Sequence, residues 1–152
     1  MMIRTLQIIL TFLLISSLAE TAFPQGTNLV DKNNLKNQKS TAQIVFDEIQ
    51  HGISEGNVAA ISGYFSAQTY LSLSNGVSGY YSSNQAYYVL EDYFKVYQIT
   101  SFRFQNIKND ESSPYATGIY NYEFKGKRDN ARVYISLKKT NNQWKISQIT
   151  FN

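Results

Sequence analysis

The stretch YATGIYNYEFKGKRDNARVYISLKKTNNQWKISQITF, residues 115–151, decides the fold of this chain. Apolar and polar side chains alternate in three segments of it: Tyr115 to Phe124, Ala131 to Lys139 and Gln143 to Phe151. Alternation of this kind is typical of strands that bury one face. The segments are separated by Lys125 to Asn130 and by Asn141-Asn142, whose polar residues and glycine favour turns. The stretch therefore predicts three antiparallel strands joined by short turns.

The last of these strands has a break in its alternation. Trp144 and Ile146 share one face, whereas strict alternation places Ile149 and Phe151 on the other face. One extra residue in a strand moves all later side chains to the opposite face. We therefore expect a β-bulge near Ser147-Gln148.

Before this stretch, the sequence predicts three helices and three further strands. Apolar residues three or four positions apart indicate helices, and alternating residues indicate strands. The predicted helices run from Ser40 or Thr41 to Gly56, from Asn57 to Phe65, and from Ser82 or Ser83 to Tyr97. The predicted strands are Gln68 to Ser74, a short strand near Tyr80-Tyr81, and Ser101 to Lys108. This arrangement predicts an α+β fold.

Three groups of residues mark this order of elements. They are Ile53-Ser54-Glu55-Gly56-Asn57 with Tyr64-Phe65, Gly79-Tyr80-Tyr81-Ser82 with Gln85-Ala86 and Phe94, and Arg132-Val133-Tyr134-Ile135-Ser136-Leu137-Lys138-Lys139 with Trp144-Lys145-Ile146. With them, the chain from about Thr41 to Phe151 resembles the nuclear transport factor 2-like superfamily. Within it, the chain resembles an exported bacterial family called domain of unknown function 4783. The resemblance implies a cone-shaped fold, in which a curved antiparallel sheet wraps around about three helices. That superfamily includes isomerases, dehydratases, hydrolases and binding modules, so its fold implies no single activity.

The first 19 residues have the pattern of a secretory signal peptide. Arg4 precedes an apolar core from Leu6 to Leu18, and Ser17-Leu18-Ala19 has small residues where a signal peptidase cleaves. We expect residues 1–19 to be a signal peptide, 20–40 a flexible leader and 41–152 the folded domain. The protein is then periplasmic or secreted, and it meets a membrane only during export. An uncleaved membrane anchor is the alternative, although the apolar run is short for a span of about 20 residues.

Charge and composition argue against several kinds of site. The chain has 14 Lys and Arg against 11 Asp and Glu, and this small excess does not predict nucleic-acid binding. It has no Cys and one His, His51, on the polar side of the first helix. We therefore expect no metal and no cofactor, and no catalytic residue can be assigned. The best candidate for a general base is Glu123, but alternation places it on the outer face of its strand.

Aromatic residues are abundant, with 12 Tyr, 9 Phe and 1 Trp. Six tyrosines are expected at the cavity or its mouth: Tyr70, Tyr80, Tyr93, Tyr97, Tyr120 and Tyr122. Apolar rings with a few hydroxyl groups are typical of a site for a small apolar ligand. The alternative is that the rings fill the interior of the cone as core.

Two further groups are candidates for contact with partners. Arg132, Tyr134 and Lys138 share a strand face that we interpret as the outer face of the sheet, where a homodimer can form. Lys125, Lys127 and Arg128 are interpreted as one cluster with Lys138 and Lys139. This cluster binds an anionic envelope polymer or an acidic partner, or it is simply a solvated turn.

The sequence thus favours an exported, non-catalytic domain that binds a small apolar ligand or a protein partner. It does so through an aromatic-rich cavity or the outer sheet face. The alternative is an isomerase- or dehydratase-like enzyme that uses the cavity tyrosine hydroxyls.

Overall fold

Three helices and six strands make up residues 41–109 and 112–152, the part of the chain that the computed structural model describes. The helices are α3 (Thr41–Ser54), α4 (Val58–Ser62) and α5 (Ser83–Val96). The strands are β1 (Phe65–Ser72), β2 (Ser78–Tyr81), β3 (Gln98–Lys108), β4 (Tyr115–Phe124), β5 (Lys127–Thr140) and β6 (Gln143–Phe151). The predicted signal peptide and leader lie outside the described residues.

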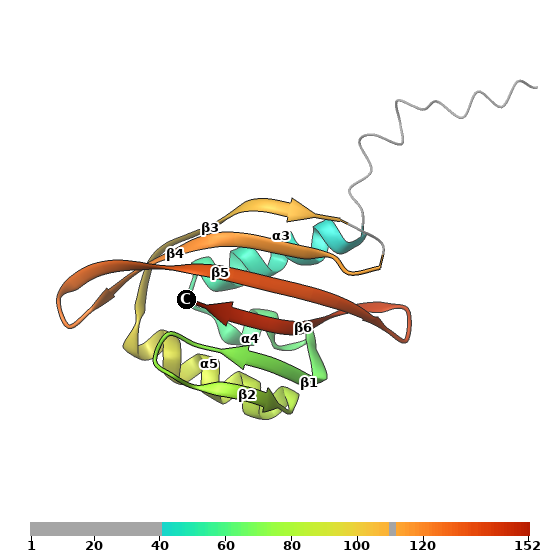
Figure 1. Ribbon diagram of the computed structural model, residues 1–152, viewed down its shortest axis with the longest axis horizontal. Coiled ribbons are helices and arrows are strands. Elements are labelled where there is room, and N and C mark those ends of the chain that lie inside the picture. The colour runs from blue at the N-terminus through green and yellow to red at the C-terminus, as the bar shows by residue number, and fades with distance from the viewer. Residues whose placement is uncertain (1–40, 110–111) are drawn as a thin grey trace, which may run out of the picture. The chain divides into compact units, whose positions relative to one another are not determined.

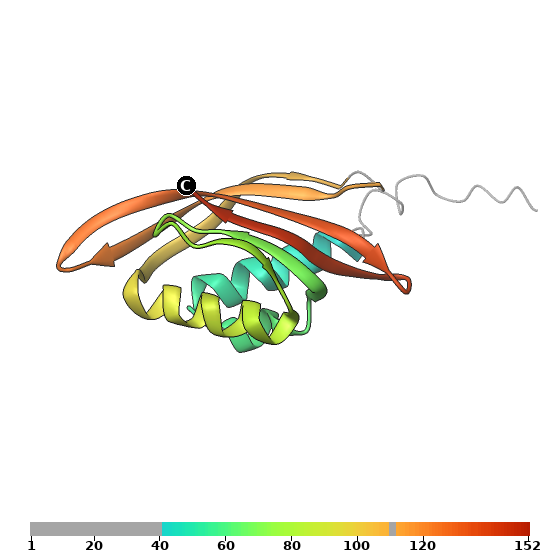
Figure 2. The ribbon, with the colours of Figure 1, turned by 60° about the horizontal axis from the view of Figure 1, so that its bottom comes forward.

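The six strands form one sheet in the order β2-β1-β6-β5-β4-β3 (Figure 1). All neighbours are antiparallel except β1 and β6, which run parallel. The sheet curves over the helices, which all lie on its concave side (Figure 2). The expected α+β architecture, a curved sheet around three helices, is confirmed.

The helices are held to the sheet by apolar faces with helical spacing. Phe46, Ile49 and Ile53 of α3 are fully buried, as are Ala86 and Leu90 of α5. On the sheet, alternate residues of the central strands point to the same core, which is why their predicted alternation was informative. The start of α5 has a capping box in which Ser82 and Gln85 satisfy each other's backbone N–H.

Several predicted boundaries were wrong because local turn geometry overrode periodicity. The second helix ends at Ser62 instead of Phe65, since Phe65 already begins β1. The turn predicted over Lys125 to Asn130 consists only of Lys125 and Gly126, which both have positive φ (52° and 74°). Such a two-residue turn matches the twist of a hairpin, so β5 begins at Lys127.

The remaining boundaries differ by smaller amounts. The strand predicted over Gln68 to Ser74 runs from Phe65 to Ser72, and the one predicted from Ser101 begins at Gln98. Tyr97, predicted to end the third helix, is the residue that follows α5 and caps it.

The predicted bulge in β6 is confirmed. Ser136 pairs with Gln148 and Leu137 pairs with Ile146, so Ser147 is the extra residue. The bulge turns Ile146, Ile149 and Phe151 to the core side together.

Close backbone contact shapes the sheet where β3 pairs with β4 near Gly118. A Cβ atom on Gly118 would lie 2.4 Å from the backbone oxygen of Arg103, closer than two non-bonded atoms can approach. The β3–β4 register also shifts between Phe104 and Asn106, where Gln105 is the extra residue. A glycine next to a bulge lets a sheet bend strongly. These residues therefore help to produce the concave face that receives the helices.

The outer edge of β3 is covered by polar side chains of α3. The Phe104 backbone N–H donates to Gln50 Oε1 at 2.7 Å, and Ser54 Oγ donates to the Phe102 carbonyl at 3.0 Å. Unpaired backbone groups on an edge strand invite pairing with another chain. Helix α3 thus both packs on the concave face and satisfies part of the open edge.

Candidate functional site

Four of the six predicted cavity tyrosines meet inside the domain. The Tyr93 and Tyr97 rings stack with centroids 4.5 Å apart, and Tyr97 contacts Tyr122 edge-on at 5.2 Å. Tyr120 lies 5.8 Å from Tyr122, and Phe151 lies 5.1 Å from both Tyr93 and Tyr120. These are ordinary separations for packed aromatic rings. We call Tyr93, Tyr97, Tyr120, Tyr122 and Phe151 the aromatic cluster.

The hydroxyl groups of the two most buried tyrosines are engaged within the protein. Tyr120 donates to the backbone oxygen of Tyr97 at 2.6 Å, and the Tyr93 hydroxyl lies 2.8 Å from Ser74 Oγ. Burial raises the pKa of Tyr93 to about 12 and raises the pKa of Tyr120 as well. Both groups are therefore neutral at physiological pH, and both already have hydrogen-bond partners.

Tyr70 and Tyr80 do not join this cluster. In β1 the inward residues are Thr69 and Leu71, so Tyr70 between them points to the outer face. Tyr80 pairs with Tyr70 across the β1–β2 hairpin, their ring centroids are 5.1 Å apart, and Tyr80 is 73% exposed. The expectation that the six tyrosines lie at one cavity or its mouth was wrong for Tyr70 and Tyr80, because strand alternation separates these two from the others.

Among the described residues, the Asp, Glu, His, Lys and Arg side chains lie outside the core. Apart from tyrosines, the buried polar side chains of the described residues are Ser66, Thr69 and Thr150. Glu123 belongs to the outer face of β4, since its neighbour Tyr122 is buried and points inward. His51 is exposed and lies 3.4 Å from Glu55. Within the described ranges, no group of three or more His, Cys, Asp or Glu side chains is placed to hold a metal ion.

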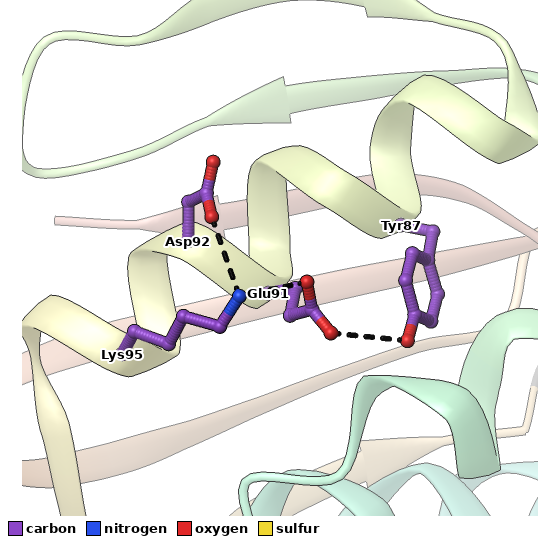
Figure 3. Close-up of polar contacts among 4 residues, drawn as sticks. All are labelled: Tyr87, Glu91, Asp92 and Lys95. Carbon is purple, nitrogen blue, oxygen red and sulfur yellow. Dashed lines mark hydrogen bonds and ion pairs between the residues drawn. The ribbon is translucent and has the colours of Figure 1, made fainter.

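The acidic residues of α5 form ion pairs and a hydrogen bond with other side chains of the same helix (Figure 3). Lys95 Nζ lies 2.9 Å from Glu91 and 3.6 Å from Asp92, and the Tyr87 hydroxyl donates to Glu91 at 3.1 Å. The hydrogen bond from Lys95, followed by that from Tyr87, lowers the pKa of Glu91. Glu91 is therefore ionised at neutral pH and is used in a surface network, as its spacing from Lys95 predicts.

The outer face of the sheet carries aromatic and cationic side chains. Tyr134 of β5 stacks on Tyr115 of β4, with ring centroids 5.6 Å apart. Arg132 and Tyr134 line a hollow of about 560 Å³ together with Gln105. We call this the Arg132 hollow.

A second hollow lies farther across the same face. It measures about 380 Å³ and is lined by Tyr70, Tyr80 and Lys138, with Gln148 among the other lining residues. The predicted trio of Arg132, Tyr134 and Lys138 therefore shares the outer face, but Lys138 belongs to a different hollow from the other two.

The predicted lysine cluster is not one cluster. Strand β5 runs from Lys127 at the β4–β5 turn to Thr140 at the β5–β6 turn, and these turns lie at opposite ends of the sheet (Figure 1). Lys125, Lys127 and Arg128 therefore stand far from Lys138 and Lys139. The interpretation was wrong because the strand separating these groups is fully extended.

A groove at the β5–β6 end of the domain was not predicted from the sequence. It measures about 840 Å³ and lies between α3, α4 and the end of the β5–β6 hairpin, with Trp144 in its lining. Trp144 and Tyr64 had been noted in the sequence only as packing residues. The one available signal was that the single Trp of the chain stands beside lysines at a hairpin end.

None of the described helices is both long and apolar enough to span a membrane.

The model of the family called domain of unknown function 4783 (DUF4783) matches residues 46–152. The chain belongs to the DUF4783 family. A comparison of this DUF4783 chain with curated proteins finds no match.

Solved structures similar to this DUF4783 protein confirm its fold. A DUF4783 family protein from Bacteroides uniformis has 21% identity and a TM-score of 0.64, over 70% of this chain and 94% of that one. An NTF-2 like protein of unknown function from Shewanella oneidensis has 14% identity and a TM-score of 0.51, over 73% and 95%. A protein from Catenulispora acidiphila with a ketosteroid isomerase-like fold, solved with trimethylamine, has 10% identity and a TM-score of 0.57, over 71% and 83%. At these identities the likeness shows the nuclear transport factor 2-like fold alone.

Proposed function

We propose that this protein is an exported, non-catalytic binding module that pairs with a second copy of itself through the outer face of its sheet. The observation that carries the proposal is the contrast between the two faces. The concave face is covered by three helices, whereas no described helix covers the outer face (Figure 2). This outer face nevertheless carries the stacked Tyr115 and Tyr134 beside Arg132.

The chemistry of this face suits an interface between proteins. Tyr and Arg are enriched in protein interfaces, because each combines a large apolar area with directional hydrogen bonding. Thr117 and Ile119 of β4 are partly buried on the same face and extend its apolar area around the Arg132 hollow. A second copy related by twofold symmetry would present the same residues, so the face needs only to be complementary to itself.

The aromatic cluster gives less support to a small-ligand site in the interior. Tyr93 and Tyr120 are at most 1% exposed, and their hydroxyls already have partners. The ring centroids already lie about 5 Å apart, so the rings bury one another's apolar surface. An apolar ligand could enter only by pushing these packed rings apart. The enzyme alternative also loses its best base, because Glu123 lies on the outer face of β4.

The pairing is tested by measuring molar mass in solution by light scattering. The wild type is expected to be a dimer, and Tyr134→Glu is expected to be a monomer, because the new carboxylate would be buried without a partner. Tyr88→Glu is the matched control, since Tyr88 is 63% exposed on α5, away from the sheet face. A monomeric wild type, or a dimer that Tyr134→Glu leaves intact, would refute pairing through this face.

Export rests on the signal-like pattern of residues 1–19. It is tested by determining the N-terminus of the protein recovered from the cell envelope or medium. Cleavage after Ala19 is the expected result, and an intact N-terminus in the cytoplasm would contradict export.

A further inference from the structure

The groove at the β5–β6 end of the domain has the size and lining of a small-molecule site. Its volume of about 840 Å³ falls within the range of about 300–1,000 Å³ that is usual for such sites. One wall consists of the small apolar side chains Ala59 and Ala60 of α4 with Val45 of α3, and Trp144 of β6 contributes an aromatic ring. The Trp144 ring is fixed in place, because its Nε1 donates to Thr41 Oγ1 at 3.0 Å.

Two lysines in this groove have no acidic partner among the described residues. Lys139 Nζ lies 5.4 Å from the centroid of the Trp144 ring, and Lys145 Nζ donates to the Gly63 carbonyl at 2.7 Å. No described carboxylate forms an ion pair with either lysine. An ammonium group has three hydrogen-bond donors, so both lysines retain donors for a ligand.

Among the described residues that line the groove, Glu48 is the one carboxylate, and it is already engaged. The Tyr64 hydroxyl donates to Glu48 Oε2. This hydrogen bond is the main reason that the pKa of Tyr64 is raised to about 12. Tyr64 therefore stays neutral at physiological pH, and the described lining of the groove has two positive charges against one negative charge.

We propose that this groove binds an organic carboxylate with a flat apolar body. The carboxylate would accept hydrogen bonds from Lys139 and Lys145, and the apolar body would lie against Trp144 and the alanine wall. The net positive charge selects an anion, and the apolar wall selects a ligand with a hydrophobic part. This site lies on the helix side of the sheet, so it is separate from the outer face proposed for pairing.

The position of the single tryptophan allows a direct binding assay. Trp144 is the only Trp of the chain, so its fluorescence reports on the groove alone. The probes are phenylacetate and hydrocinnamate, with phenylacetamide as an uncharged analogue of the same shape. Saturable changes in fluorescence are expected with the carboxylates, and a much weaker change is expected with the amide. Added salt should weaken the carboxylate binding, because it screens exposed charges.

Neighbouring lysines provide a matched pair of variants. Lys139→Gln removes a charge from the groove, and Lys138→Gln removes the same charge from the opposite face of the same strand. Lys139→Gln should weaken binding about two- to fivefold, as expected for the loss of one exposed ion pair, and Lys138→Gln should leave it unchanged. Glu48→Gln should strengthen binding by a similar factor, a gain that damage to the fold cannot produce.

Three results would overturn the proposal. They are the absence of a saturable change with both carboxylates, equal binding of phenylacetamide, and equal effects of the two lysine variants. Urea unfolding of each variant shows whether a loss of binding reflects a loss of fold.

Discussion

Replacing Gln50 with methionine tests how α3 satisfies the open edge of β3. Gln50 Oε1 accepts the Phe104 backbone N–H at 2.7 Å in a partly buried position. Methionine keeps the apolar stem and a similar helix propensity but removes the acceptor. A buried donor left without a partner costs about 1–3 kcal/mol, and partial access of water favours the lower half of that range. We expect Gln50→Met to lower the free energy of unfolding by about 1–2 kcal/mol.

Urea unfolding monitored by circular dichroism measures this cost. With a slope of about 1–3 kcal/mol per molar urea, the midpoint should fall by roughly 0.3–2 M at an unchanged slope. Gln50→Glu is the matched control, because its carboxylate still accepts the Phe104 N–H and should retain most of the stability. Equal stability of Gln50→Met and the wild type would refute the reasoning, and so would equal losses in both variants.

Three further predictions concern other parts of the domain. Gly118→Ala should destabilise the protein, because the new Cβ would lie 2.4 Å from the Arg103 backbone oxygen. The expected loss in the free energy of unfolding is about 3 kcal/mol or more, the cost of overpacking that shifts the backbone. Thermal unfolding measures this loss. Ser82→Ala should cost about 1 kcal/mol in urea unfolding, because it removes half of a capping box. Tyr64 should ionise near pH 12, at a higher pH than ordinary tyrosines, and Glu48→Gln should lower the pKa of Tyr64. The titration of Tyr64 alone is measured as the difference in tyrosine absorbance between a protein with Tyr64 and the same protein with Tyr64→Phe. This difference is recorded for the wild type and for Glu48→Gln. Because the pKa of Tyr64 is raised by folding, the stability that it contributes is complete below pH 10 and is lost as the pH rises through about 12.

The fold could be predicted well because its signals are local. The alternation from Tyr115 to Phe124 and the break in alternation at Ser147 both report the pleat of a single strand. Errors arose where a turn decides where a strand begins. Lys125 adopts a positive φ that non-glycine residues rarely take, and nothing in the residue pattern announces that β5 starts two residues later.

The candidate sites were predicted less well because they depend on which face and which neighbour a residue meets. Tyr70 and Tyr120 look alike in sequence, yet one lies on the outer face and the other is fully buried. Which face each tyrosine meets depends on how the alternation of β1 is aligned with the alternation of β4. These two strands are not neighbours, because β6 and β5 lie between them in the sheet.

The sequence by itself determined the α+β class, the order of the elements, and the placement of carboxylates and basic side chains away from the core, because periodicity and turn chemistry act over a few residues. Only the tertiary structure decided that four tyrosines pack together, that two others face outward, and that a groove forms at the β5–β6 end. In that groove Trp144 meets Thr41, and Lys145 meets Gly63, across 103 and 82 positions of the chain. Contacts over such separations arise when the sheet curves over the helices, and no local pattern records them.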